Sequence, residues 1–428
     1  MQSLRLNRPT PGRRAALALP GDKSISHRAF ILAAVAHGRT RIQGVNRGLD
    51  VMATVRALRQ LGVPITLMHG EYHVRGVDRF RDPRSAIDCG NSATTMRLLA
   101  GLLAGRVEAV LDGDASLRKR PMSRIAEPLN RMGGGVTTAR AGRPPIRLRR
   151  AAATLAPIRY RLPVASAQLK SALLLAALRA SGPSAIVEPA TTRDHTEILL
   201  RAMCAKLTTK GRTLRISPSR LVAPGRLRIP GDVSAAVYVV CAAALLPGTR
   251  LLLRHVGVNP TRTAALDVLR RMGVRLGLSM LGSWSGEPVA DIAVAGGAAL
   301  RNVTVPARLV PQLIDEIPAL CALAASARGT FSIRGAGELR VKESDRIATT
   351  VALLCSFGAD ARPLPDGIVV RGGRPLRAPR SVSTHGDHRL GFAAAILAAA
   401  TRSALRIDDS ACMATSFPSF AAIWRKAF

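Results

Sequence analysis

The side chains best suited to chemistry gather in the segment Pro20-Gly-Asp-Lys-Ser-Ile-Ser-His-Arg-Ala29. A short apolar run over residues 15–19 predicts a buried strand before this segment, and apolar side chains at helical spacing predict a helix from Ser24 to about Ala36, which Gly38 ends. Lys23, Ser24 and Arg28 therefore surround a helix N-terminus, where free N–H groups and the helix dipole favour negative charge. The segment predicts a binding site for an anion.

Lys23 is chemically unusual among the basic residues of this chain. Only seven of the 63 lysine and arginine residues are lysines. A lysine retained among so many arginines indicates a position that needs a compact, titratable ammonium group and not the planar, permanently charged guanidinium group of arginine. The alternative interpretation is an ordinary helix start with a solvated lysine.

The composition indicates two domains with ample core, because 47% of the 428 residues are hydrophobic. No uncharged apolar run reaches the roughly 18 residues that a membrane span requires. The basic N-terminal residues lack the apolar stretch of a secretory signal. The six cysteines are scattered singly, which is typical of reduced thiols and not of a disulfide framework or a zinc site. We therefore expect a cytoplasmic protein.

The formal net charge of +36 allows two kinds of partner. A nucleic-acid-binding protein is one alternative, but aromatic residues make up only 3% of the chain, so stacking platforms for single strands are nearly absent. The arginines are also spread along the whole chain and do not form one stripe. These features favour small anionic molecules as partners, with no specific nucleic acid.

Two repeats indicate how the chain is organised. Apolar helical patterns that end in a hydrophobic-glycine turn recur at spacings of about 70 residues, at residues 57–63, 129–134, 266–274 and 351–359. In addition, Pro20-Gly-Asp-Lys-Ser24 returns as Pro230-Gly-Asp-Val-Ser234, again between an expected strand and an expected helix. We therefore expect two lobes of repeated α/β units, residues 19–228 and residues 1–18 together with 229–428.

Further strand-turn-helix junctions carry polar side chains at the turn, at residues 88–97, 113–122, 164–170, 314–318, 340–346 and 383–389. In the second of these, Pro121 is expected at the first position of a helix. Each of them could be only a solvated helix cap. Positive charge at helix N-termini is unfavourable unless an anion offsets it. Such cations recur at Lys23, Arg28, Arg120, Lys342, Arg346 and Arg389. Together they indicate sites for two phosphates and a carboxylate.

The chain has no Walker-type glycine loop, no G-x-G-x-x-G motif and no metal-spaced set of histidines and cysteines. We therefore expect neither a cofactor nor a metal. His27, His195 and His388 lie near the polar junctions, and we interpret them as structural residues.

These segments together resemble the 5-enolpyruvylshikimate-3-phosphate synthase (3-phosphoshikimate 1-carboxyvinyltransferase) family. The motifs GDKSISHRA, GNSATTMRLL, GDASLRKRPM, SAQLKSALL, RDHTE, NPTRT, DEIP, RVKESDR and GDHR stand in the family's order between Leu17 and Phe420. The resemblance implies an inside-out α/β barrel of two lobes, each of three βαβαββ units, with helix N-termini aimed at the ligands. It also implies transfer of the enolpyruvyl group of phosphoenolpyruvate to the 5-hydroxyl of shikimate 3-phosphate, with release of phosphate.

The resemblance further implies roles for individual residues. The shikimate 3-phosphate site would comprise Lys23, Ser24, Arg28, Ser166, Ala167, Gln168, Arg193, Asp315 and Lys342. The phosphoenolpyruvate site would comprise Lys23, Ala93, Arg120, Gln168, Arg346 and Arg389. Lys23, Asp315 and Glu343 would be the catalytic groups. The first lobe would lie on the shikimate 3-phosphate side, and the second would carry phosphoenolpyruvate contacts and the catalytic acids.

The chain departs from the family's common pattern at three places. Ala93 stands where glycine is frequent, which predicts relative insensitivity to glyphosate. Residues 390–392, Leu-Gly-Phe, put a glycine inside an expected helix, and Ser416 stands where some members carry a ligand-binding lysine. We assign no contact to Ser416.

Two alternatives to this activity come from different classes. One is the sister enzyme that transfers enolpyruvyl to UDP-N-acetylglucosamine, a family that uses a loop cysteine, whereas residues 113–122 contain none. The other is the basic nucleic-acid-binding protein, which only the net charge favours. We expect the protein to act as a monomer on small anionic substrates.

Overall fold

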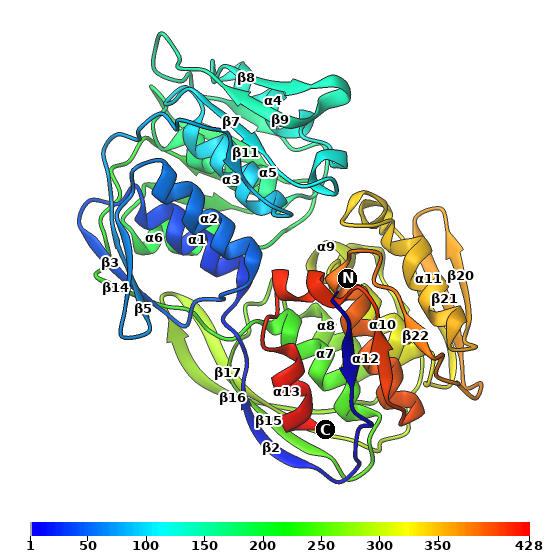
Figure 1. The fold of residues 1–428 in the computed structure, drawn as a ribbon. Helices are drawn as coiled ribbons and strands as arrows, with labels where there is room; N and C mark the ends of the chain where they lie inside the picture. The colour runs from blue at the N-terminus through cyan, green and yellow to red at the C-terminus, as the bar shows by residue number, and fades with distance from the viewer. Residues whose placement is uncertain (1) are drawn as a thin grey trace. The chain divides into compact units, whose positions relative to one another are not determined.

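A computed structural model describes residues 2–428 (Figure 1). The chain forms two compact units. The N-terminal unit comprises Gly21–Ile229 and Trp284–Glu287, and the C-terminal unit comprises Pro230–Ser283, Pro288–Phe428 and the first residues up to Pro20. Strands and helices occur throughout both units, so the expected two-lobed α/β fold class is confirmed.

The N-terminal unit holds three four-stranded sheets with the orders β14-β3-β5-β4, β6-β7-β9-β8 and β10-β11-β13-β12. In each sheet the first pair of strands is parallel and the next two pairs are antiparallel. The strands are β3 (Arg39–Gln43), β4 (Ile65–Met68), β5 (Glu71–Arg75), β6 (Ile87–Asp88), β7 (Ala109–Asp112), β8 (Val136–Ala139), β9 (Arg143–Leu148), β10 (Arg159–Arg161), β11 (Ser184–Val187), β12 (Leu207–Lys210), β13 (Thr213–Ile216) and β14 (Arg226–Arg228). The helices are α1 (Lys23–Ala33), α2 (Leu49–Gln60), α3 (Ala93–Leu103), α4 (Ser123–Arg131), α5 (Ala167–Ala177) and α6 (His195–Ala202).

The C-terminal unit repeats this plan with sheets β16-β17-β15-β2, β18-β19-β21-β20 and the shorter β1-β23-β22. The strands are β1 (Leu4–Leu6), β2 (Arg14–Ala18), β15 (Arg250–Gly257), β16 (Arg275–Trp284), β17 (Glu287–Ala295), β18 (Thr304–Val305), β19 (Gly329–Ile333), β20 (Asp360–Leu364), β21 (Gly367–Gly372), β22 (Ser381–Val382) and β23 (Leu405–Ile407). The helices are α7 (Val233–Ala244), α8 (Ala264–Arg271), α9 (Val310–Leu313), α10 (Ile317–Ala324), α11 (Arg346–Ser356), α12 (His388–Thr401) and α13 (Phe420–Ala427).

In each unit, the strand that precedes the first central helix in the sequence belongs to a sheet of the other unit. Strand β2 directly precedes α1 in the sequence, but it pairs in parallel with β15. Strand β14 directly precedes α7, but it pairs in parallel with β3. Residues 284–287, at the tip of the β16–β17 hairpin, cluster with the N-terminal unit, whereas the division expected from the sequence placed all of residues 229–428 in one lobe.

Each unit is built around three helices that are buried on nearly all sides, α1, α3 and α5 in one and α7, α10 and α12 in the other. Such helices are hydrophobic around most of their circumference because they face core in every direction. Helices α3 and α5 approach closely at Gly101, where a Cβ atom would lie 2.2 Å from the carbonyl oxygen of Ala172. All six helices begin within or next to the polar segments that the sequence analysis selected, so the fold places those segments at helix N-termini.

Two helix boundaries differ from the expected ones. Helix α1 ends at Ala33 and not near residue 36. Its last turn is tighter than an α-helical turn, because the Val35 amide donates to the carbonyl of Leu32, three residues earlier. Helix α4 begins at Ser123 and not at Pro121, because Arg120 has extended backbone angles after a short 3-10 turn.

Within residues 2–428, no helix has the length and apolar character needed to cross a membrane. The same residues contain no group of three or more His, Cys, Asp or Glu side chains that could hold a metal ion.

Candidate active site

Lys23 is the first residue of α1, and its side chain is paired, not solvated. The Asp22 carboxylate caps the helix by accepting a hydrogen bond from the Ile25 amide at 2.9 Å. The Lys23 Nζ atom lies 2.9 Å from Oδ2 of Asp50 in α2, and the two side chains are only 16% and 9% exposed. The solvated-lysine interpretation is therefore wrong. The sequence did not single out Asp50, because an acid in a first helical turn is typical of an ordinary helix start.

Arg28 lies one turn further along α1 and is buried. Its Nε donates to Thr196 Oγ1 at 2.6 Å, and its Nη2 donates to Ser171 Oγ at 2.9 Å. The Ser24 carbonyl accepts a third hydrogen bond, from Nη1, at 3.0 Å. The guanidinium is therefore held by oxygens of three helices.

The neighbouring His27 is also buried, and it shares a 2.7 Å hydrogen bond with Thr54 Oγ1 through Nδ1. Burial lowers the pKa of His27 well below its ordinary value, and the positive charges of Lys23 and Arg28 act in the same direction. His27 is therefore a neutral, buried side chain in contact with α2.

The start of α3 meets the start of α5 through a second set of polar contacts. Arg97 Nη1 donates to Gln168 Oε1 at 2.5 Å, and Gln168 Nε2 donates to Thr94 Oγ1 at 2.8 Å. Gln168 is thus fixed from both sides of its amide. Ser166 caps α5 by accepting a hydrogen bond from the Leu169 amide, and Ala167 is the first residue of that helix.

Arg120 and Ala93 belong to the same region. The Arg120 side chain is largely buried, and its Nη2 donates to Asn91 Oδ1 at 3.0 Å. Ala93, the first residue of α3, is buried. Arg193 lies in the loop between β11 and α6, three residues before Thr196, which holds Arg28.

All nine candidate residues of the N-terminal unit thus lie in the first two turns of a helix or in the few residues before one, and a hydrogen bond joins Arg28 to the Ser24 carbonyl. Asn91, Thr94 and Arg97 had been noted only as part of a motif. The sequence showed these three residues as polar side chains after an expected strand. It did not show that Arg97 and Thr94 hold Gln168, or that Asn91 holds Arg120.

In the C-terminal unit, Arg346 binds three carboxylates at once. Its Nη1 lies 3.1 Å from Asp315 Oδ1 and its Nη2 lies 2.6 Å from Glu343 Oε2. Its Nε donates to Asp387 Oδ2 at 2.7 Å. Burial alone would lower the pKa of Arg346, but the charges of Asp387, Glu343 and Asp315 raise it well above its ordinary value. Arg346 therefore remains charged and holds both predicted catalytic acids.

Asp387 was missed as a member of this site, although it stands within the GDHR motif. It is fully buried, and it also caps α12 by accepting a hydrogen bond from the Arg389 amide at 2.9 Å. Asp387 is therefore a structural anchor for Arg346 and for the start of α12.

Arg389 and Lys342 complete the cations of this unit. The Arg389 guanidinium lies 4.0 Å from Asp315 Oδ2 and 5.7 Å from the centre of the Tyr238 ring. Burial acts to lower its pKa, but Tyr238 and Asp315 raise it above its ordinary value. Burial lowers the pKa of Lys342, with Asp315 acting in the opposite direction. Lys342 is thus the cation of this set that can lose its proton most easily.

Gly391, the unusual glycine inside α12, has a packing explanation. A Cβ atom at this position would lie 2.8 Å from the Met413 sulfur. The glycine therefore leaves room for the Met413 side chain, which would have to shift if a Cβ atom were present.

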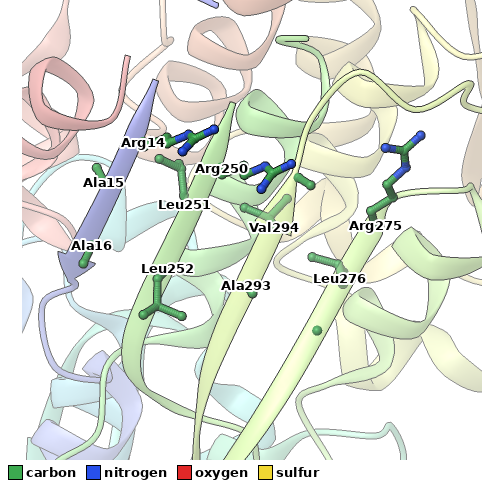
Figure 2. A pocket seen from close by; sticks show the side chains of 12 residues that line it. Arg14, Ala15, Ala16, Arg250, Leu251, Leu252, Arg275, Leu276, Ala293 and Val294 are labelled. Carbon is green, nitrogen blue, oxygen red and sulfur yellow. The ribbon is translucent and has the colours of Figure 1, made fainter. Parts of the chain in front are cut away.

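A shallow groove of about 820 Å³ lies elsewhere in the C-terminal unit, over the sheet β16-β17-β15-β2 (Figure 2). Figure 2 shows Arg14, Arg250 and Arg275 along one end of its strands, above an apolar floor of alanine and leucine side chains. None of the candidate residues line this groove. It is therefore separate from the candidate active site.

The two sets of side chains support complementary chemistry. The N-terminal set offers cations and neutral hydrogen-bond donors at helix N-termini, which suits a phosphorylated polyol. The C-terminal set combines cations with two carboxylates that can accept and return protons, which suits acid-base chemistry on an anionic substrate.

Comparison with solved structures identifies the class of protein. The enolpyruvyl transferase NikO from Streptomyces tendae has the same fold, with a TM-score of 0.77 at 18% sequence identity over 99% of this chain and 96% of that one. The EPSP synthase of Acinetobacter baumannii is more similar, with a TM-score of 0.86 at 39% identity over 100% of this chain and 98% of that one.

The sequence itself narrows this class to one family. Residues 11–424 match the sequence profile of EPSP synthase (3-phosphoshikimate 1-carboxyvinyltransferase). The 3-phosphoshikimate 1-carboxyvinyltransferase of Desulforudis audaxviator is 47% identical over 96% of both chains. That of Halorhodospira halophila is 46% identical over 95% of this chain and 92% of its own. The chain belongs to the EPSP synthase family, and the resemblance inferred from its motifs is confirmed.

Proposed function

We propose that this enzyme transfers the enolpyruvyl group of phosphoenolpyruvate to the 5-hydroxyl of shikimate 3-phosphate and releases phosphate. The observation that carries the proposal is the start of all six central helices at the polar segments of the family, in a chain that matches the family over nearly its full length. This agreement favours the proposed reaction over enolpyruvyl transfer to UDP-N-acetylglucosamine and over nucleic-acid binding.

Shikimate 3-phosphate would contact the set of polar residues that the family resemblance implies. The proposed contacts are Lys23, Ser24, Arg28, Ser166, Ala167, Gln168, Arg193, Asp315 and Lys342. The buried position of Arg28 and the doubly hydrogen-bonded amide of Gln168 support these assignments, because fixed donors lose little freedom when a ligand binds.

Phosphoenolpyruvate would contact Lys23, Ala93, Arg120, Gln168, Arg346 and Arg389. Arg346 and Arg389 support this assignment because both remain charged although they are buried. Preorganised cations in such surroundings stabilise the negative charge of a phosphate and a carboxylate more strongly than they would in water.

The proposed proton transfers use three groups. Asp315 takes the proton of the 5-hydroxyl as its oxygen attacks C2 of phosphoenolpyruvate, while a proton is delivered to the methylene carbon to form a tetrahedral ketal phosphate. The methyl group then returns a proton as the C–O bond to phosphate breaks. Glu343 and Lys23 would handle the protons at the carbon and at the leaving phosphate, each acting as an acid in one step and a base in the other.

A coupled assay of phosphate release tests the proposal. Phosphate should appear only when phosphoenolpyruvate and shikimate 3-phosphate are both present. Release with UDP-N-acetylglucosamine in place of shikimate 3-phosphate, or no release with either acceptor, would contradict it. We further propose that the protein works as a cytoplasmic monomer without a cofactor, and light scattering at assay concentration would measure its mass.

The lowered pKa of Lys342 predicts a pH dependence of substrate binding. The protonated ammonium attracts shikimate 3-phosphate, and it loses its proton at a lower pH than an ordinary lysine does. The KM for shikimate 3-phosphate is therefore expected to increase as the pH rises through this lowered pKa. In Lys342→Arg the increase should disappear, because arginine stays protonated. Lys119→Arg, at an exposed position, is the matched control; superimposable KM profiles for all three proteins would show that Lys342 is not the titrating group.

Ala93 predicts discrimination against glyphosate, a longer analogue of phosphoenolpyruvate. Its methyl group is buried at the first residue of α3. Overpacking a tight pocket costs about 1–3 kcal/mol, so Ala93→Gly is expected to bind glyphosate about 5- to 150-fold more tightly. Competitive inhibition curves against phosphoenolpyruvate measure the change. Ala126→Gly, also a buried helical alanine of this unit, controls for the helix effect of glycine; an equal gain in that variant would exclude the steric explanation.

A further inference from the structure

Behind Arg28 lies a cluster of three buried charges that makes no proposed contact with substrate. Lys170 of α5 has its Nζ 3.1 Å from Glu188 Oε2 and 2.6 Å from Glu197 Oε1. The three side chains are 1%, 6% and 4% exposed. Desolvation opposes such clusters, so burial of an ion pair is by itself weak evidence for a stabilising role. Its position in the structure indicates what else it does.

The ion pair between Lys170 and Glu197 joins α5 to α6 at residues that are adjacent in sequence to two hydroxyl groups. Ser171 follows Lys170 in α5, and Thr196 precedes Glu197 in α6. These two hydroxyls lie 2.6 Å apart. Both accept hydrogen bonds from the guanidinium of Arg28, at 2.9 and 2.6 Å.

The proton inventory of the two hydroxyls leaves one consistent arrangement. Ser171 donates its single proton to the Ala167 carbonyl at 2.6 Å. Thr196 must then donate its proton to Ser171, and both oxygens present lone pairs to Arg28. The positions of the two hydroxyls therefore fix the orientation of the guanidinium, and the ion-paired residues Lys170 and Glu197 are their immediate neighbours in the two helices.

We propose that the Lys170–Glu197 ion pair positions Arg28 for shikimate 3-phosphate by setting the distance between α5 and α6. Neither residue touches the substrate, so both are positioning residues. The same ion pair connects the first turn of α5, which carries Gln168, to the first turn of α6, which Arg193 precedes. The inference rests on the proposed substrate site of this unit.

The charges of this region support the assignment. Glu188, Glu197 and Lys170 together have a formal charge of −1. Arg28, which donates to the hydroxyls of Ser171 and Thr196, has a formal charge of +1. Burial raises the pKa of Glu197, and Lys170 opposes that change. Lys170 thus offsets part of the cost of burying the Glu197 carboxyl group.

The test is Glu197→Gln, which keeps the shape of the side chain and leaves Lys170 paired with Glu188. We expect the dissociation constant of shikimate 3-phosphate to increase about 10-fold, measured by calorimetry, with a matching increase in KM and little change in kcat. An unchanged dissociation constant in a folded variant would overturn the proposal.

Glu188→Gln is the matched control, because Glu188 binds the same ammonium group and is equally buried but lies outside α6. It is expected to change thermal stability about as much as Glu197→Gln and substrate affinity much less. Equal losses of affinity in the two variants would show that the cluster acts only through general stability.

A double-mutant cycle with Arg28→Lys tests the route of the effect. If Glu197 acts through Arg28, the losses of affinity in Glu197→Gln and Arg28→Lys are strongly non-additive. Additive losses would overturn the proposed route. Wild-type protein that fails to bind shikimate 3-phosphate would instead refute the proposed function, so the two failures are distinguishable.

Discussion

Replacing Lys23 by arginine is expected to lower kcat/KM by about 100- to 10,000-fold although the positive charge is kept, because general acid-base groups contribute effects of this size. The Lys23 ammonium fits into a 2.9 Å pair with Asp50, in a site where it is 16% exposed. An arginine fork is longer and planar, and it does not release a proton near neutral pH. It would therefore misplace both substrates and could not serve as an acid.

Steady-state kinetics of Lys23→Arg and Lys119→Arg measure this effect. Both changes exchange a lysine for an arginine in the same unit, but Lys119 is exposed and has no proposed role. Lys119→Arg should retain normal turnover. A Lys23→Arg enzyme with turnover near that of the wild type would mean that charge alone suffices at this position.

Replacing Arg346 by methionine is expected to lower the free energy of unfolding by about 3–5 kcal/mol, in addition to abolishing activity. Arg346 is 1% exposed and binds Asp315, Glu343 and Asp387. Methionine has a similar length but no charge, so three carboxylates would lose their common partner. Asp387 is the most severely affected, because it is itself fully buried.

Urea denaturation at two pH values measures this loss and its cause. The carboxylates raise the pKa of Arg346, so its charge and theirs stabilise each other. Without Arg346, protonation relieves the repulsion among the three carboxylates, so the deficit in stability is expected to be smallest at low pH and to grow as the pH rises. Arg118→Met, which removes an exposed partner of Asp112, should leave the stability unchanged at both pH values. A deficit for Arg346→Met that does not vary with pH would point to lost packing as its cause.

The starts of the central helices were predictable because their signals are local. The cap of α1 by Asp22 and the cap of α5 by Ser166 depend on residues within one turn. The boundaries at residues 36 and 121 were predicted wrongly for the same reason. A tightened last turn and an extended Arg120 depend on how neighbouring segments pack, which local patterns do not contain.

The partners of the functional side chains were the least predictable part of the site. Arg28 meets Thr196, which is 168 positions away, and Arg346 meets Asp387, which is 41 positions away. Asp50, Arg97 and Asp387 carry no local signal that distinguishes them from other charged residues on helices.

The sequence by itself determined the repeated α/β plan, the polar helix starts, the family and the residues that we propose bind anions, because each of these depends on residue type, spacing and order. The tertiary structure alone decided which carboxylates balance which cations, that Lys23 is paired with Asp50, and that Lys170 and Glu197 lie behind Arg28. The physical reason is distance: charge pairing, burial and the resulting pKa shifts are set by side chains a few ångströms apart that the chain brings together from remote positions.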